Sequence, residues 1–254
     1  MRVIVFGASG RVGIHLVESV LADPGLDLAA AVVSAQSSRL GLPVAAGALE
    51  YRATDPSMNA HSDVIVDFST PDASIDLQRM LDRKPIPVVI GTTGFSRDQQ
   101  HHLKSAARYR PILASANFAV GFEPFLRAVA AFAGRQPGAE ASVEETYHAR
   151  KKAAPSGTSR RLSAEVHAAR AAALAALRDH GTIAAPPIGV RREGQTVGVN
   201  TVKFDMGASD VTVAFTVHSL AAYAQGALAA ARWLVESAPG PGLYDLADTF
   251  EVSA

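Results

Sequence analysis

The chain of 254 residues contains no cysteine, which excludes disulfide bonds, thiolate metal sites and a cysteine nucleophile. It also lacks an excess of either charge, since 24 Lys and Arg residues balance 24 Asp and Glu residues. This balance argues against nucleic acid or an anionic membrane surface as the main partner. No apolar run is long enough to cross a bilayer, and the stretch from Val3 to Phe6 is too short for a signal peptide. These absences predict a cytoplasmic protein whose specificity comes from local sites. The histidines are scattered without the spacing of a ligand set, so we expect no bound metal.

Strand-like apolar runs alternate with helical patterns through the first half of the chain. The runs fall at residues 3–6, 28–33, 64–68, 88–90 and 112–114, and the helical patterns at 12–22, 73–81 and 97–107. This rhythm predicts an α/β fold with a Rossmann-type, doubly wound parallel sheet. After Asn117 the pattern changes to helices at 122–134 and 163–177 and strands at 141–147, 196–204 and 211–217, which predicts an α+β region. A helix at 222–237 closes the chain.

A glycine-rich loop directly follows the first expected strand and opens the first expected helix. Its residues are Gly7, Ala8, Ser9, Gly10, Arg11, Val12 and Gly13. Glycines at such a turn let the backbone approach a pyrophosphate, while the helix N-terminus faces the phosphates. The loop therefore predicts a dinucleotide site, with Arg11 assisting by charge or by stacking on the adenine. The alternative is a tight turn that binds nothing.

The end of the second expected strand has no carboxylate to hold the ribose hydroxyls of NAD. The stretch instead offers hydroxyls and one cation, which suit a ribose phosphate: Ser34, Ser37, Ser38 and Arg39. We therefore expect NADPH to be preferred, with NADH possible as a second cofactor.

Three further loops follow later strands of the same expected sheet, where doubly wound sheets bind ligands. They are Phe68-Ser69-Thr70, Gly91-Thr92-Thr93 and Ser115-Ala116-Asn117-Phe118. Their small and hydroxylated side chains leave room for a nicotinamide ring and offer it hydrogen bonds. Ordinary turn chemistry is the alternative for each loop taken alone.

The stretch from Glu145 to Thr158 joins a candidate proton donor, a basic cluster and an anion site. Pro155, Ser156, Gly157 and Thr158 fall at the opening turn of the helix expected at 163–177, where backbone N–H groups favour a carboxylate or phosphate. Lys151 adds a positive charge a few residues earlier. The stretch predicts a small acidic substrate. The alternative is an ordinary capped helix preceded by a basic segment that is exposed to solvent.

These segments together resemble the dihydrodipicolinate reductase family, whose members reduce a cyclic unsaturated dicarboxylate of the lysine and diaminopimelate pathway with NAD(P)H. The resemblance rests on the glycine loop, Gly91-Thr92-Thr93-Gly94, residues 115–118, Lys151 with residues 155–158, residues 226–234, and Gly242-Leu243-Tyr244-Asp245. It implies a dinucleotide-binding domain at 1–117 plus 222–254, and an inserted domain at 118–221 that binds substrate and builds a homotetramer. It also implies that Lys151, His148 and the N–H groups of Gly157 and Thr158 hold the ring carboxylates. The resemblance further implies that Gly91, Thr92 and Thr93 contact the nicotinamide.

The chain departs from the family pattern at several polar positions. The family has two adjacent histidines before the lysine, the first as proton donor, and this chain has Tyr147 followed by His148. An unperturbed tyrosine, with a pKa of about 10, is a weaker acid near neutrality than a histidine at about 6.5. Ala153 replaces an aspartate, and Phe215 and Leu220 stand where a histidine and an arginine are common.

Because of these changes, three functions are weighed. The first is reduction of dihydrodipicolinate, with the proton supplied by Tyr147, His148 or water. The second is reduction of a different acidic imine or enoate by a paralogous enzyme. The third is a non-catalytic regulatory protein that binds NADPH.

Overall fold

The computed structural model describes residues 1–45, 47, 49–55, 61–151, 154–177 and 183–250. Two compact units make up the chain: Met1–Val120 with Leu220–Ala254, and Gly121–Ser219. The expected boundaries were residues 117/118 and 221/222, and the roles assigned to the two units stay predictions.

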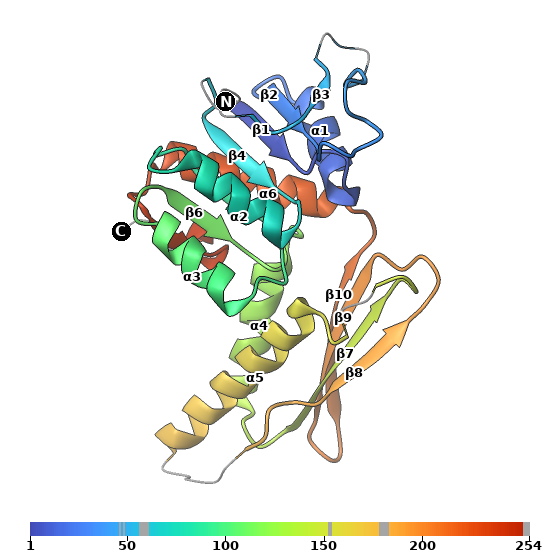
Figure 1. Cartoon of the computed structure of the whole chain (residues 1–254). Coiled ribbons are helices and arrows are strands. Elements are labelled where there is room, and N and C mark those ends of the chain that lie inside the picture. Colours follow the sequence, from blue (N-terminus) through green and yellow to red (C-terminus); the bar gives the residue numbers. More distant parts are fainter. Residues whose placement is uncertain (46, 48, 56–60, 152–153, 178–182, 251–254) are drawn as a thin grey trace. The chain divides into compact units, whose positions relative to one another are not determined.

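Within the described residues, the first unit holds a seven-stranded sheet in the order β11-β6-β5-β4-β1-β2-β3 (Figure 1). Every neighbouring pair in it is parallel. The strands are β1 (Arg2–Phe6), β2 (Asp27–Val32), β3 (Tyr51–Arg52), β4 (Val64–Asp67), β5 (Val88–Ile90), β6 (Pro111–Ala114) and β11 (Gly242–Tyr244). The predicted α/β class with a parallel sheet is confirmed.

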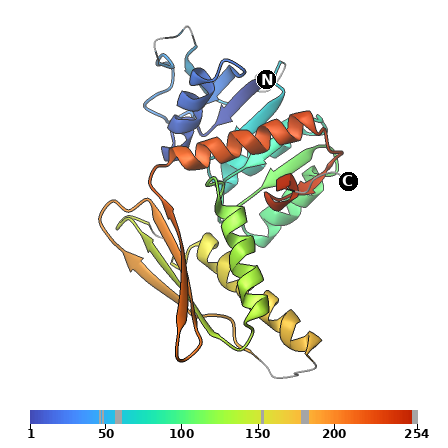
Figure 2. The same ribbon diagram turned by 180° about the vertical axis from the view of Figure 1, so that it is seen from behind.

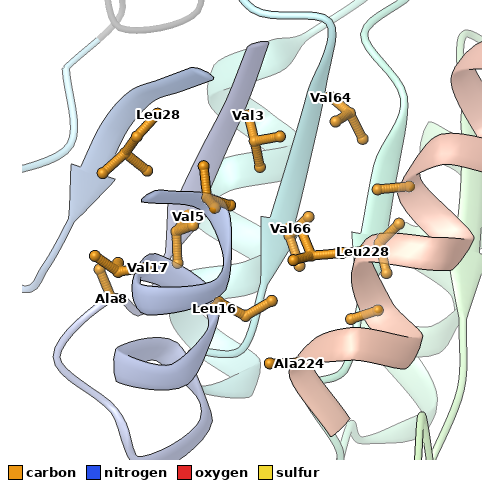
Figure 3. Close-up of a cluster of buried hydrophobic side chains, with 14 of the residues drawn as sticks. Val3, Val5, Ala8, Leu16, Val17, Leu28, Val64, Val66, Ala224 and Leu228 are labelled. Carbon is orange, nitrogen blue, oxygen red and sulfur yellow. The ribbon is translucent and has the colours of Figure 1, made fainter. Parts of the chain in front are cut away.

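Helices cover both faces of this sheet because its central strands are apolar on both sides. Val3 and Val5 of β1 pack with α1 (Arg11–Ala22) and α6 (Ala221–Glu236), as Figure 3 shows. Ile4 and Phe6 pack toward α2 (Pro71–Leu81) and α3 (Arg97–Ala106). Figure 2 shows α6 lying across its face of the sheet. This is the doubly wound arrangement, and it brings the loops after the strands to one edge of the sheet.

The second unit pairs a four-stranded sheet with two helices. The described strands run in the order β10-β9-β7-β8, with β7 (Glu140–Tyr147), β8 (Ile188–Arg192), β9 (Gly198–Asp205) and β10 (Asp210–Val217). The pairs β10–β9 and β7–β9 are antiparallel, whereas β7 and β8 are parallel. Helices α4 (Phe122–Arg135) and α5 (Gly157–Ala176) pack on one face through a core that includes Val143, Leu162 and Val202.

The start of helix α5 lies at the expected opening turn, residues 155–158, ahead of the helical run at 163–177. The helix begins at Gly157 because Ser156 caps it and its hydroxyl accepts the N–H of Ser159. The short strands β3, β8 and β11 were not predicted. Strand β8 is an edge strand with largely exposed residues, so it has no alternating apolar pattern to detect.

Candidate functional sites

The glycine loop forms a tight turn between β1 and α1. Gly7 has φ +82°, and a Cβ there would lie 2.5 Å from the carbonyl oxygen of Phe68. A Cβ on Gly13 would lie 2.1 Å from the carbonyl oxygen of Gly7, so α1 packs directly on the loop. Helix α1 starts at Arg11, and its N-cap Gly10 offers no side-chain cap. The first turn of α1 is therefore arranged to receive an anion on its backbone N–H groups.

A cavity of about 260 Å³ lies beside this loop, at the carboxyl ends of β1, β2 and β4. Predicted cofactor residues line it: Gly7, Ser9, Gly10, Ser34, Phe68, Ser69 and Thr70. Thr54 and Ala73 also line it, and neither was predicted. Since every lining residue belongs to the first unit, the structure brings residues from the loops after β1, β2, β3 and β4 together into one hollow suited to a dinucleotide.

The other predicted cofactor residues do not line this cavity. Arg39 places its guanidinium 3.3 Å from the Tyr51 hydroxyl and 5.6 Å from the centre of that ring. Ser37 Oγ accepts the N–H of Arg39, which fixes the turn after β2. The predicted residues outside the lining are Ala8, Arg11, Val12, Ser37, Ser38, Arg39, Gly91, Thr92, Thr93, Ser115, Ala116, Asn117 and Phe118.

The loops after β4, β5 and β6 lie side by side in the first unit. Thr92 Oγ1 accepts the N–H of Ser69 at 3.0 Å, and the rings of Phe68 and Phe118 are 5.8 Å apart. Ser115 Oγ accepts the N–H of Asn117 at 3.2 Å, which is ordinary turn chemistry. The structure thus joins the predicted nicotinamide loops to the edge of the cavity through Phe68 and Ser69.

Asp67, at the end of β4, is a buried residue that the sequence analysis missed. Its Oδ1 accepts the Ser69 hydroxyl at 2.6 Å, the Ser69 N–H at 2.9 Å and the Thr92 hydroxyl at 3.2 Å. Burial raises the pKa of the Asp67 carboxyl above its ordinary value, against these hydrogen bonds, which favour the charged form. Asp67 therefore links two predicted nicotinamide loops. Its carboxyl group keeps its proton to a higher pH than that of an ordinary aspartate, because its pKa is raised.

The Asp67→Asn variant is expected to gain stability over the parent as the pH rises. The unfolded parent ionises near pH 4 and the folded parent only at a higher pH, so the stability present below about pH 4 is lost as the pH rises toward the folded pKa. The variant has no carboxyl group at this position and does not lose this stability. The loss in the parent is about 1.4 kcal/mol for each unit by which the pKa of Asp67 in the folded protein exceeds that in the unfolded protein. Urea unfolding of both proteins at about pH 4 and pH 7 measures it. An equal difference at both pH values would contradict the raised pKa.

In the second unit, a buried polar network surrounds the start of α5. Glu145 is fully buried; it accepts the N–H of Ser156 at 2.9 Å and pairs with Arg192 at 2.8 Å, and its carboxylate also contacts the Ser159 hydroxyl. Burial opposes ionisation, but the hydrogen bonds from Ser156, Ser159 and Arg192 hold the pKa of Glu145 below its ordinary value. The network fixes the helix start on β7 and was not predicted.

Tyr147 and Lys151 lie together beside this network. The Lys151 Nζ is 3.9 Å from the centre of the Tyr147 ring, and Asn200 Nδ2 donates to the Tyr147 hydroxyl at 3.1 Å. His148 is half-buried, and its carbonyl oxygen accepts the N–H of Lys151 at 3.0 Å. The predicted residues at 147, 148 and 151 therefore share one tight turn.

Ser156, Gly157 and Thr158 form the cap and first turn of α5, as predicted. The departure at Ala153 lies outside the described residues. Phe215 stands where a histidine is common in the family. Its ring stacks on Phe125 with the ring centres 5.5 Å apart, so it packs against the core of the second unit. Within the described residues, no group of three or more His, Asp and Glu side chains is placed to hold a metal ion. No helix in the described part of the chain is both long and apolar enough to cross a membrane.

Comparison with known proteins covers nearly the whole chain. Residues 1–118 match the family model for the N-terminus of dihydrodipicolinate reductase, and residues 121–250 match the model for its C-terminus. The chain is 36% identical over 269 residues to a 4-hydroxy-tetrahydrodipicolinate reductase of Anaeromyxobacter dehalogenans strain 2CP-1, covering 97% of this chain and 96% of the relative. It is also 36% identical over 262 residues to the enzyme of that name from Nitratidesulfovibrio vulgaris strain DP4, covering 98% of each chain.

Solved structures share the fold. A dipicolinate-bound dihydrodipicolinate reductase from Paenisporosarcina sp. TG-14 has a TM-score of 0.75 and 19% identity over 96% of this chain and 97% of its own. An amine dehydrogenase from Mycobacterium smegmatis has a TM-score of 0.64 and 12% identity over 97% of this chain and 95% of its own. Neither of the two alternative functions is favoured by these relatives. The chain belongs to the dihydrodipicolinate reductase family of NAD(P)H-dependent oxidoreductases.

Proposed function

We propose that this chain reduces 4-hydroxy-tetrahydrodipicolinate, a small cyclic dicarboxylate of the lysine and diaminopimelate pathway, with NADPH as the preferred reductant. The observation that carries the proposal is the presence, in one chain, of a glycine-loop cavity and of Lys151 close to the capped start of α5. The first suits a dinucleotide and the second suits a carboxylate. The two relatives of this name described above match at least 97% of this chain.

The residues of the first unit fit the cofactor. Alanine in place of Gly7 or Gly13 would clash with backbone atoms, so the turn needs glycine and leaves the first turn of α1 open to a pyrophosphate. Ser69, Thr70, Thr92 and Thr93 would offer hydrogen bonds to the nicotinamide amide. When bound, the reduced cofactor would supply a hydride to the unsaturated ring that forms once the 4-hydroxyl group of the substrate leaves as water.

The residues of the second unit would hold the substrate. The N–H groups of Gly157 and Thr158 receive one ring carboxylate at the positive end of α5. Lys151 and His148 contribute positive charge and hydrogen bonds to the carboxylates. Tyr147, His148 or water supplies the proton that completes the reduction. Together these groups would orient the acceptor carbon.

The test follows oxidation of NADPH by the purified protein with freshly generated 4-hydroxy-tetrahydrodipicolinate. We expect saturable turnover that requires both ligands and that dipicolinate inhibits competitively with the substrate. Tight NADPH binding without any turnover would overturn the proposal and favour a regulatory protein. Turnover only with a different imine or enoate would assign another substrate.

Cofactor preference is expected to depend on Arg39. A guanidinium near the end of β2 would pair with the ribose phosphate that distinguishes NADPH from NADH. The Arg39→Leu variant should raise KM for NADPH by about 10-fold or more and leave KM for NADH nearly unchanged. Arg83→Leu is a matched control because Arg83 also lies over a tyrosine ring, that of Tyr109, but it follows helix α2 and not strand β2. An equal rise in both KM values would contradict this role.

We also propose a homo-oligomer, a tetramer by family resemblance, that forms through the face of the second sheet opposite α4 and α5. The register places small and uncharged side chains at the centre of this face: Thr146, Val199, Thr201, Ala214 and Thr216. Glu144, opposite Thr201, and its ion-pair partner Arg191 border these uncharged side chains. The face suits a second copy of itself because the contact can close by symmetry.

The Ala214→Arg variant should lower the mass measured by light scattering, because it buries a charge in that contact. Ala175→Arg, on the exposed end of α5, is the matched control and should leave the mass unchanged. A parent protein that is monomeric at micromolar concentration would contradict the assembly. An unchanged mass for Ala214→Arg would show that the subunits do not meet through this face of the sheet.

A further inference from the structure

Tyr147 is held inside the second unit by the register of β7 and β9. Val143 pairs with Val202 and Glu145 with Asn200 on the face that α4 and α5 cover, and the Tyr147 side chain continues this row. Only 2% of Tyr147 is exposed. On β9 a Cβ at Gly198 would lie 2.7 Å from the Tyr147 ring, so glycine makes room for the ring. The ring therefore has one defined position.

The hydroxyl of Tyr147 is tied into the network at the start of α5. It accepts the Asn200 amide at 3.1 Å, and Asn200 is itself only 1% exposed. The Asn200 Oδ1 lies 3.1 Å from Ser159 Oγ, which also contacts Glu145. A hydroxyl held in this way anchors the ring to the same helix start that receives the substrate in the proposed function.

The face of the ring supports a cation. The Lys151 Nζ lies 3.9 Å from the ring centre, within the range of a cation–π contact, and the Arg192 guanidinium carbon lies 5.9 Å from it. The backbone makes this possible, because the turn closed by the N–H of Lys151 on the carbonyl oxygen of His148 folds the chain back over residue 147. The lysine stem is flexible, and the ring face gives its ammonium a fixed neighbour.

We propose that Tyr147 is a positioning residue: its ring holds the Lys151 ammonium where the substrate carboxylate binds, and its hydroxyl anchors the ring through Asn200. This inference rests on the proposed function of the Lys151 site. It removes Tyr147 from the candidate proton donors and leaves the proton to His148 or water. Gly198 and Asn200 then belong to the substrate site through Tyr147, although they contact no ligand.

The test compares Tyr147→Phe with Tyr147→Leu. Tyr147→Phe keeps the ring and should retain kcat within about threefold, with an unchanged pH profile. Tyr147→Leu removes the ring and should raise KM for the dicarboxylate by about 10-fold, with a smaller change in kcat. In the Tyr147→Leu background, Lys151→Met should cost less than it does in the parent, because the two residues act as one unit. A fall in kcat of about 100-fold for Tyr147→Phe, with loss of one limb of the pH profile, would make Tyr147 the acid and overturn the proposal.

A second measurement is independent of turnover. In protein labelled with ¹³C-lysine, the ring current of Tyr147 should shift the ε-methylene protons of Lys151 upfield. The shift should persist in Tyr147→Phe, which also covers the case in which Tyr147→Leu does not fold. Its absence in the parent would overturn the proposal, and so would its complete loss in Tyr147→Phe, which keeps the ring packed on Gly198. The shift could be present although neither the parent nor the variants oxidise NADPH with the dicarboxylate. In that case the proposed function fails, but the contact of Lys151 with the Tyr147 ring is supported.

Discussion

The Lys151→Met variant is expected to lose about 10- to 150-fold in kcat/KM for the dicarboxylate substrate. Methionine keeps most of the length of the side chain but removes the ammonium, so the variant loses a charge-assisted hydrogen bond worth about 1.5–3 kcal/mol. Each 1.36 kcal/mol corresponds to about tenfold in rate, which gives the stated range. Steady-state kinetics with freshly generated substrate and saturating NADPH measure the loss.

Two comparisons separate this effect from general damage. Lys104→Met, on the exposed surface of α3, is the matched control and should keep the kcat/KM of the parent. Calorimetry should show that Lys151→Met still binds NADPH as the parent does but binds dipicolinate more weakly. If Lys151→Met turned over substrate like the parent, the anion site would have to lie elsewhere in the chain.

The Gly13→Ala variant is expected to abolish NADPH binding and to destabilise the protein by about 2–4 kcal/mol. The added methyl carbon would lie 2.1 Å from the carbonyl oxygen of Gly7 and 2.9 Å from the Cα of Ala8. Both atoms are backbone, so α1 must move away from the loop, and the open first turn of the helix moves with it. Circular dichroism during urea unfolding measures the stability, and quenching or enhancement of NADPH fluorescence measures the binding.

Gly134→Ala is the matched control for this change. Gly134 lies inside helix α4, where the nearest atom to an added Cβ is 3.8 Å away. Alanine is the better helix former, so this variant should gain about 1 kcal/mol and bind NADPH normally. Wild-type affinity and stability in Gly13→Ala would show that α1 does not depend on close contact with the glycine loop.

The parts of the fold that the sequence predicted are those with strong local patterns. The run Val3–Phe6 is buried on both faces, and the glycines after it permit the tight turn, so β1, the loop and α1 follow from neighbouring residues. Strand β8 could not be predicted in this way. It is an exposed edge strand whose arginines pair with Glu144 and Glu145 of β7, and such partners depend on tertiary structure.

In the candidate sites, too, residues grouped by strand order were predicted, whereas residues placed by distant contacts were not. The loops after β1, β2 and β4 share one edge because parallel strands place their carboxyl ends together, so sequence order was enough to group them. Asp67 and Asn200 were missed because their roles come from contacts with residues distant in the sequence. Asp67 meets Thr92 of the next loop, and Asn200 reaches Tyr147 only through the pairing of β9 with β7.

The proposed function requires direct transfer of a hydride from a dinucleotide to a dicarboxylate bound by the same chain. The most direct measurement uses NADPH carrying deuterium at either one of the two C4 positions and follows the label into the product by mass spectrometry. We predict one deuterium in the reduced dicarboxylate from one of the two labelled cofactors, and no transfer from the other. Oxidation of the cofactor with no label in the product from either form would contradict the account.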